Sequence, residues 1–269
     1  MTGLAPLLAA YDDQLRTDAE TPSASRVDRL GPLRLVTFPG GRGFVTYPDL
    51  GGADAAGVRE LVASAVEHYR GDEEIVRVEW KTRGHDHAPG LHEALTGAGF
   101  VPDGTESIMV GRTEELAAVD VVPPDGVTLR RIDAEADVRA MQAMADEVFG
   151  DPPSAGNADA ILRRQAVDPA MEIWIAEAGD EIVSAGRLEP VAGTEFAGVW
   201  GGSTRPGWRG RGIYRALTAA RARSALAAGK PLMHSDSTEH SRPILERAGM
   251  VKVSTTTPYR WRRHAEADR

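Results

Sequence analysis

The chain contains no cysteine among its 269 residues, so it has no disulfide, no thiolate nucleophile and no cysteine-ligated metal. Long apolar runs are also missing, and no segment approaches the roughly 18 uninterrupted apolar residues of a membrane span. The first twenty residues include a short apolar stretch, but no basic region precedes it and acids follow at once. This pattern is untypical of a secretory signal. We therefore expect a soluble, cytoplasmic protein without a membrane partner.

Aromatic residues are scarce as well, at 6% of the chain, and the formal net charge is −9. Proteins that bind single-stranded nucleic acid stack the bases on aromatic side chains, and phosphate backbones attract basic surfaces. This chain has few aromatic residues, and its net charge is negative. We therefore expect no nucleic-acid partner.

The acidic charge is unevenly distributed, because one stretch has no acid at all. The 40 residues between Glu195 and Asp236 contain neither aspartate nor glutamate. Their cations are Arg205, Arg209, Arg211, Arg215, Arg221, Arg223 and Lys230. This window should meet an anion.

The length favours two domains of roughly 100–150 residues each. A boundary is predicted at 119–126, where Pro123, Pro124 and Gly126 cannot continue regular structure and residues 127–132 then alternate apolar and polar. We therefore predict a first domain over 1–118, a linker over 119–126 and a second domain over 127–269.

The second domain has a clear order of predicted elements. A strand at 127–132 is followed by helices at about 134–149 and 157–167, and then by strands at 171–178, 181–191 and 197–204. A helix at 211–228, a strand at 231–237, a short helix capped by Ser241 and a final extended pair complete it.

An internal repeat supports the division into two halves. Ala98-Gly99-Phe100-Val101 matches Ala248-Gly249-Met250-Val251 at a separation of 150 residues. A predicted helix at 54–70 and a strand at 75–80 occupy the places of the helix at 211–228 and the strand that follows it. The two halves are predicted to be copies of one fold.

The segment from Trp208 to Ile213, with the sequence WRGRGI, lies between a predicted strand and a predicted helix. A glycine-rich turn at a helix N-terminus can direct several backbone N–H groups at one phosphate. The spacing matches neither the P-loop nor the dinucleotide fingerprint. The alternative is a simple tight turn flanked by solvated arginines.

This segment resembles the GNAT acyltransferases, whose pattern [Q/R]-x-x-G-x-[G/A] opens the central helix. Residues 209–213 fit its first five places and Pro206 precedes them, whereas Tyr214 stands where glycine or alanine is usual. The resemblance covers about 127–262, and SRPILERAGM is similar to the family's last helix, LYExxGF. It implies an α/β fold, an α+β mixed sheet, with two GNAT-like domains in tandem.

The resemblance also implies a cosubstrate, acetyl-CoA, and assigns residues to it. The pantetheine would pair with the end of the strand and the pyrophosphate would meet the helix N-terminus. The implied cofactor-binding residues are Gly202, Ser203, Thr204, Arg209, Gly210, Arg211, Gly212, Ile213, Tyr214 and Arg215.

The implied reaction is direct attack of a primary amine on the thioester, which needs a base and a donor for the leaving thiolate. The tyrosine that often donates in this family is replaced by Leu245. Tyr214, Ser237 or an ordered water is then the alternative donor.

A family carboxylate would fall near Gly198, and Glu195 is three residues away, so Glu195 is the predicted base. His234 and Asp236 share one face of their strand and are weaker possibilities. The predicted protein is an N-acetyltransferase with an unidentified, small-molecule acceptor, as a monomer or homodimer. The alternative is an acyl-CoA-binding or sensor protein without catalysis.

The first domain departs from the pattern and is predicted to be a degenerate copy. Its equivalent loop has Gly51 and Gly52 but no arginine, and it carries Asp49 and Asp54. Those carboxylates would repel a pyrophosphate and cap the helix themselves. His85, His87 and His92 form a group without a second ligand cluster, so we expect no metal.

Overall fold

A computed structural model describes residues 3–263, which form two compact units. Unit 1 comprises residues up to 108 together with 236–239 and those from 253 onward. Unit 2 comprises 109–235 and 240–252. Each unit is therefore assembled from segments that lie far apart in the sequence.

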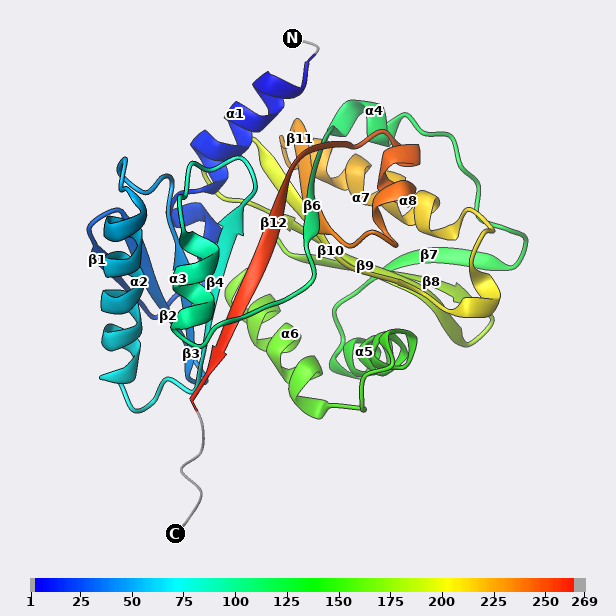
Figure 1. Cartoon of the computed structure of the whole chain (residues 1–269). Helices are drawn as coiled ribbons and strands as arrows, with labels where there is room; N and C mark the ends of the chain where they lie inside the picture. The colour runs from blue at the N-terminus through cyan, green and yellow to red at the C-terminus, as the bar shows by residue number, and fades with distance from the viewer. Residues whose placement is uncertain (1–2, 264–269) are drawn as a thin grey trace. The chain divides into compact units, whose positions relative to one another are not determined.

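Unit 1 is a mixed sheet with helices against it (Figure 1). Its elements are α1 (Leu4–Leu15), the 3-10 helix η1 (Asp18–Glu20), β1 (Arg26–Leu30), β2 (Leu33–Phe38), β3 (Arg42–Thr46), α2 (Ala55–Arg70), β4 (Arg77–Arg83), α3 (Leu91–Gly97), β5 (Val101–Pro102) and most of β12 (Val251–Arg262). The strand β6 (Glu106–Arg112) begins in unit 1 and ends in unit 2.

The sheet of unit 1 has the order β1-β2-β3-β4-β12, and β5 also pairs with β12. Strands β1, β2 and β3 form an antiparallel meander, whereas β3 and β4 are parallel. Helices α2 and α3 lie on one face of this sheet (Figure 1). The core between them is built around the fully buried Trp80, whose ring packs edge to face against Phe100 with the ring centroids 6.3 Å apart.

Unit 2 contains most of the helices and strands that the sequence predicted for the second half, together with two short helices that it did not predict. They are α4 (Thr113–Ala117), β7 (Val127–Ile132), α5 (Glu135–Phe149), α6 (Ala155–Val167), β8 (Glu172–Ala178), β9 (Glu181–Pro190), β10 (Phe196–Thr204), η2 (Pro206–Trp208), α7 (Ile213–Ala227), β11 (Leu232–Ser237) and α8 (Arg242–Ala248). Strand β11 belongs to unit 2 up to Ser235, and its last two residues belong to unit 1.

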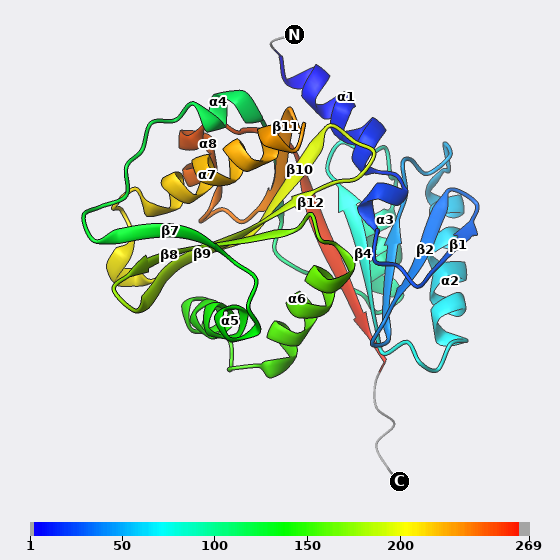
Figure 2. The same ribbon diagram turned by 180° about the vertical axis from the view of Figure 1, so that it is seen from behind.

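Strands β7 to β10 of unit 2 form an antiparallel meander, and β10 pairs in parallel with β11. Helices α5 and α6 lie on one face of the sheet and α7 on the other (Figure 2). The apolar side chains of β8 alternate accordingly, because Ile173 and Ile175 pack toward α5 while Ala176 packs toward α7.

The two halves follow the same order of elements, as the repeat predicted. In each half an antiparallel meander, β1–β3 in the first and β7–β10 in the second, is followed by a helix, a parallel strand, a short helix and a last strand. The last strand of each half leaves its own unit. Thus β12 pairs with β4 from Thr256–Arg83 to Arg262–Arg77, and Met109 of β6 lies in the core of unit 2.

Two details differ from the sequence prediction. The final segment is one continuous strand of twelve residues, not an extended pair, because pairing with β4 keeps it straight. Ser241 does precede α8, but its side chain makes no capping hydrogen bond to that helix. Its backbone is already helical, with φ −89° and ψ −27°, and an N-cap needs extended angles.

Candidate functional site

The loop before α7 leaves the start of this helix open. Gly210 and Gly212 have φ of +75° and +80°, a region that favours glycine. Gly212 is the N-cap residue and has no side chain to accept from the first turn, and among the residues that the structure describes no side-chain cap is seen there. The free N–H groups and the partial positive charge of this helix end are therefore available to an anion.

Strand β10, which leads into the loop, is irregular. Its register with β9 shifts between Trp200 and Ser203, and Gly201 has φ +62°. Its parallel pairing with β11 runs only from Phe196–Leu232 to Gly198–His234. After this point the Ser235 hydroxyl donates to the Val199 carbonyl at 2.8 Å. Within the described residues, the edge of β10 beyond Val199 has no strand partner on the β11 side, as strand-like binding of a ligand requires.

Tyr214 stands directly against this edge. A Cβ atom built on Gly202 would lie 2.5 Å from the Tyr214 hydroxyl oxygen, so only glycine fits beneath the ring. Among the predicted cofactor-binding residues, Tyr214 of α7 and Gly202 of β10 are thus neighbours. The tyrosine ring covers part of the strand edge to which the pantetheine was assigned.

The cations of the acid-free window lie in different surroundings, and several of them have partners within the protein. Arg205 contacts Glu147 at 2.7 Å and Glu181 at 3.1 Å, and Lys230 donates to the carbonyls of Val191 and Thr194. Arg221 is completely buried. Its guanidinium donates to the Leu217 and Arg187 carbonyls and to the Thr218 hydroxyl.

Three arginines of the window remain near the loop. Arg209 is exposed and donates to the Thr204 carbonyl at 3.0 Å, which holds its side chain against the end of β10. Arg211 is exposed, and its guanidinium carbon lies 4.8 Å from the centroid of the Trp208 ring. Arg215 is half-buried, and its buried Nε has no partner within the described residues. Their charge surrounds the open start of α7.

The predicted catalytic residues are spread over the molecule. Glu195 is exposed and precedes β10, so the nine residues of that strand, roughly 26 Å, separate it from the loop that Tyr214 follows. Ser237 is buried at the end of β11 and belongs by its contacts to unit 1. The three residues are not in one cluster within either unit, and their roles stay predictions.

Sequence reasoning missed two charged residues beside the irregular part of β10. Glu189 of β9 is the cross-strand partner of Gly198, and Arg187 is the partner of Trp200. The hairpin between the predicted strands could have suggested this pairing. The bulge between Trp200 and Ser203 prevents the register from being counted from sequence.

The equivalent helix start in unit 1 is closed by the chain's own carboxylates, as predicted. Asp54 accepts from the N–H groups of Ala56 and Gly57 at 3.1 and 2.9 Å, and Asp49 accepts from Gly51 at 2.6 Å. No arginine of this loop offsets the two negative charges. An added anion would compete with these carboxylates.

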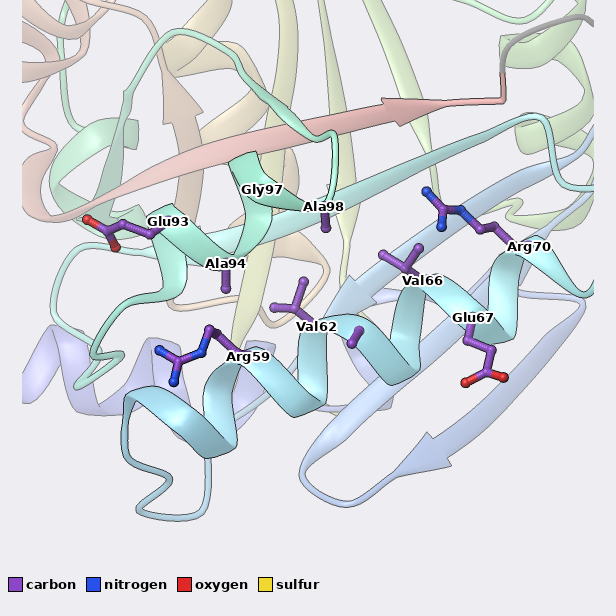
Figure 3. A pocket seen from close by; sticks show the side chains of 10 residues that line it. Arg59, Val62, Val66, Glu67, Arg70, Glu93, Ala94, Gly97 and Ala98 are labelled. Atoms are coloured by element: carbon purple, nitrogen blue, oxygen red, sulfur yellow. The ribbon is translucent and has the colours of Figure 1, made fainter.

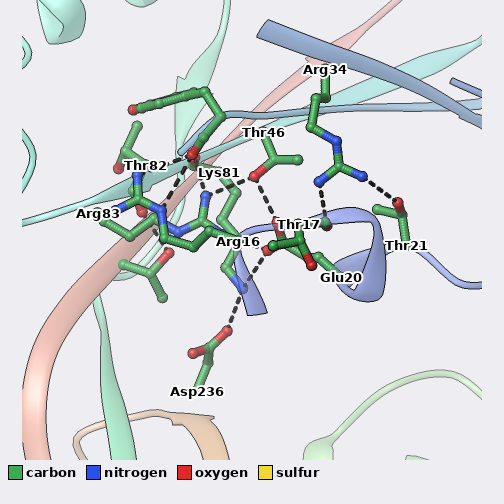
Figure 4. A network of polar contacts seen from close by, with 12 residues as sticks. Arg16, Thr17, Glu20, Thr21, Arg34, Thr46, Lys81, Thr82, Arg83 and Asp236 are labelled. Atoms are coloured by element: carbon green, nitrogen blue, oxygen red, sulfur yellow. Dashed lines mark hydrogen bonds and ion pairs between the residues drawn. The ribbon is translucent and has the colours of Figure 1, made fainter. Parts of the chain in front are cut away.

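The end of β3 in unit 1 is also covered by the chain itself (Figure 4). Arg16, just after α1, donates to the Tyr47 carbonyl through Nε and NH2. Glu20 of η1 accepts from the Thr46 hydroxyl at 2.7 Å and pairs with Arg83 of β4 at 2.5 Å. The N-terminal segment is thereby fixed on this face of the sheet.

Lys81 and Asp236 extend this network, with a separation of 2.7 Å between Nζ and Oδ2 (Figure 4). Burial alone would raise the pKa of Glu20, but Arg83, Lys81 and the Thr46 hydrogen bond outweigh it and lower that pKa to about 2. The buried charges are therefore mutually compensated, which makes the network structural.

The histidines noted in the sequence have separate partners. His85 contacts Asp12 at 3.1 Å and Ser254 at 2.6 Å, whereas His92 contacts the Tyr259 hydroxyl at 2.8 Å. Over residues 3–263 no group of three or more metal-ligating side chains occurs. Across the same range, every helix is too short or too polar to traverse a lipid bilayer.

Unit 1 has a groove between α2 and α3 (Figure 3). Its floor is apolar, with Val62 and Val66, and its rim carries Arg59, Arg70 and Glu93. It lies away from the loop at Asp49 and contains no convergent set of polar groups. The candidate functional site is therefore the one in unit 2.

Comparison with known proteins establishes the fold. Neither a family model nor a curated protein matches the sequence. The structure is similar to a GCN5-related N-acetyltransferase from Kribbella flavida, with TM-score 0.68 and 16% identity over 99% of this chain and 98% of that one. It is similar to another from Sphaerobacter thermophilus, with TM-score 0.61 and 18% identity over 96% and 91%.

A third similar structure is a tandem GNAT protein from the clavulanic acid biosynthesis pathway, with TM-score 0.61 and 14% identity over 97% of this chain and 96% of that one. The likeness extends over almost the whole of both chains. The predicted class, a mixed α/β fold with two GNAT-like domains in tandem, is confirmed. At these identities the likeness shows the fold, and the activity must be argued from the site.

Proposed function

We propose that this protein is an acyl-CoA-dependent N-acyltransferase that moves an acetyl group from acetyl-CoA to a primary amine by direct attack. The observation that carries the proposal is the open, glycine-rich start of α7 beside the unpaired edge of β10. Amides of α7 would bind the pyrophosphate, and the backbone of 202–204 would pair with the pantetheine. The bound thioester supplies the activated acetyl group.

The residues that the site provides have distinct roles in this proposal. Arg209 and Arg211 would neutralise the phosphates from the loop. Tyr214 places a hydroxyl beside Gly202 and would donate a proton to the leaving thiolate. Glu195 and Ser237 keep their proposed roles as base and alternative donor.

A second function, acyl-CoA binding without catalysis, is favoured by one observation. Leu245 occupies the place of the family's tyrosine and is buried in the apolar core of unit 2, so it offers no proton. A chain that binds acetyl-CoA but releases no thiol with any amine would have this function.

The test combines binding with turnover. Acetyl-CoA at about 100 times its dissociation constant should stabilise the fold by about 2.7 kcal/mol, which a thermal denaturation scan detects. Free-thiol release across a panel of primary amines then distinguishes the enzyme from the sensor. No shift of the melting temperature at saturating acetyl-CoA would overturn the proposed site.

Variants of the two loop arginines test where the phosphates of coenzyme A bind. Replacing Arg209 and Arg211 together by alanine should weaken coenzyme A binding by tenfold or more and leave pantetheine binding unchanged, because these side chains should meet only phosphate. The control is Arg223→Ala, an exposed arginine of α7 that donates to the Val119 carbonyl. Equal losses for both ligands would mean that the two arginines support the fold.

A further inference from the structure

A charged cluster lies on the α5/α6 face of the unit 2 sheet, opposite α7. Arg187 and Glu189 of β9 share this face because strand side chains alternate with period two. Arg164 of α6 contacts Glu189, which identifies this face, whereas Gly186, the residue before Arg187, faces Arg221 of α7. Trp200 and Gly198 of β10, as their cross-strand partners, lie on the same side.

Glu189 holds two arginines at once. It is 5% exposed, and its carboxylate lies 2.5 Å from Arg164 and 3.2 Å from Arg187. One negative charge shared by two guanidinium groups leaves the cluster with a net charge of about +1. The arginine side chains are 40% and 25% exposed, so the excess positive charge reaches solvent.

The free end of Arg187 is directed at the irregular part of β10. Its Nε contacts Glu189, and a Cβ atom built on Gly201 would lie 2.8 Å from its NH1. Gly201, with φ +62°, therefore leaves room for the guanidinium at the bulge. Within the described residues, Nη1 and Nη2 of Arg187 donate to no acceptor, and only Nε contacts Glu189. A planar fork with two such donors suits a carboxylate.

An aromatic wall borders this fork. Trp200 is half-buried, and its ring meets His234 edge to face at 5.3 Å where the pairing of β10 and β11 ends. The exposed edge of β10 used by the proposed cosubstrate begins at the same residues. A molecule held by Arg187 would thus lie next to the unpaired strand edge, on the face opposite α7.

We propose that the acceptor is an amine that carries a carboxylate, of the amino-acid class, and that Arg187 binds this carboxylate while Glu189 positions Arg187. The proposal rests on the transferase function proposed above. A single carboxylate neutralises the net charge of the cluster, whereas a phosphate dianion would leave it negative. The class of acceptor is therefore an amino acid with a single carboxylate, and its amine is presented to the edge of β10.

The test compares amino acids with matched neutral amines. Phenylalanine, glycine, β-alanine and 4-aminobutyrate are assayed against their amides and against phenethylamine, by thiol release from acetyl-CoA and by calorimetry without it. O-phosphoethanolamine tests the phosphate alternative. We expect kcat/KM for at least one carboxylate amine to exceed that of its amide by at least tenfold.

Variants of Arg187 test whether the preference for carboxylate amines arises from the charged cluster. Arg187→Gln should raise KM for the preferred amino acid at least tenfold, change kcat little and leave KM for its amide unchanged. Arg187→Lys should restore the preference only partly, because it keeps the charge but loses the fork. The control Arg163→Gln removes an exposed arginine of the same helix as Arg164 and should change neither constant.

The outcomes separate the two proposals. Carboxylate amines that bind through Arg187 without thiol release would support the inference and contradict the transferase. Turnover that is equal for amino acids and amides would overturn the inference and leave the transferase standing. Preference for O-phosphoethanolamine, or no measurable binding of any carboxylate amine, would also overturn the inference.

Discussion

Arginines illustrate how little a residue's identity says about its role in this protein. Arg211 of the loop is exposed, whereas Arg221, ten residues later in α7, is buried and donates to backbone carbonyls. The buried side chain fits only because position 186 is glycine, where a Cβ atom would lie 2.5 Å from the Arg221 NH1. A charge count over a sequence window therefore overestimates the cations that a ligand meets.

The first prediction concerns Gly212, the residue that shapes the loop. A side chain at its φ of +80° is strained, so Gly212→Ala should lower the free energy of unfolding by about 1 kcal/mol. The first turn of α7 would also shift, and acetyl-CoA should bind at least tenfold more weakly. Urea unfolding and calorimetry measure the two effects.

The matched control for this change is Gly207→Ala in the same loop. Gly207 does not have a positive φ, and a Cβ atom there would meet nothing within 4 Å. We expect it to change stability by less than about 0.5 kcal/mol. Equal effects of the two substitutions on acetyl-CoA binding would contradict the role given to Gly212.

At the scale of elements, the two equivalent helices differ in what occupies their first turns. The start of α2 is capped by Asp54, and the start of α7 has no side-chain cap. The two units also differ in what packs on their sheets, because unit 1 carries the ion network of η1 and unit 2 carries α5 and α6. Unit 1 thus closes the start of α2 with its own carboxylate, whereas the start of α7 in unit 2 is open.

The second prediction follows from the network around Glu20. Its pKa is about 2 in the folded protein and near 4.5 in the unfolded chain, so its contribution to stability is fully present above pH 4.5. That contribution is lost as the pH falls from 4.5 to 2. At about 1.36 kcal/mol per pKa unit it amounts to at most about 3 kcal/mol.

Thermal unfolding at pH 7, 4.5 and 3 checks this prediction. The Glu20→Gln variant should be less stable at pH 7, because Arg83 and Lys81 lose their buried partner, and its stability should fall less on acidification. Glu60→Gln, on the exposed surface of α2, serves as the control. A wild-type profile that runs parallel to that of Glu20→Gln would show that Glu20 does not carry the effect.

At the scale of the whole molecule, each unit depends on a strand from the other half of the chain. Tyr259 and Trp261 of β12 belong to the core of unit 1, and Met109 and Leu116 belong to the core of unit 2. The predicted sequence division at 119–126 lies in a stretch without helix or strand up to Pro124. The compact units nevertheless do not coincide with the linear halves.

The third prediction is that fragments 1–118 and 127–269 do not fold separately. Each would leave apolar core positions unfilled and a strand edge unpaired. Expressed alone, they should be aggregated or lack a cooperative thermal transition, whereas expression of both together should yield a complex on size-exclusion chromatography. A cooperative transition in either isolated fragment would refute the prediction.

The fourth prediction is the binding stoichiometry. Since the start of α2 is capped by carboxylates and that of α7 is open, we expect one acetyl-CoA per chain, bound by unit 2. Calorimetry gives this number directly, and the Gly212→Ala variant should lose the single event. A stoichiometry near two would make the protein double-headed.

The local features of this protein follow from its amino-acid sequence. Strand 127–132, the helices, the repeat at 150 residues and the acidic cap of α2 depend on neighbouring residues, whose periodicity and backbone preferences can be read directly. The glycine-rich loop before α7 was recognisable for the same reason. Its spacing sets the backbone conformation without help from the rest of the chain.

Contacts between residues far apart in the sequence became visible with the three-dimensional fold. The exchange of β6 and β12 depends on pairing between segments more than 100 residues apart, and the neighbours of Gly198 and Trp200 depend on the bulge in β10. The burial of Arg221 and the fork of Arg187 at Gly201 follow from that register. Contacts of this kind come from three-dimensional packing, which local sequence patterns do not encode.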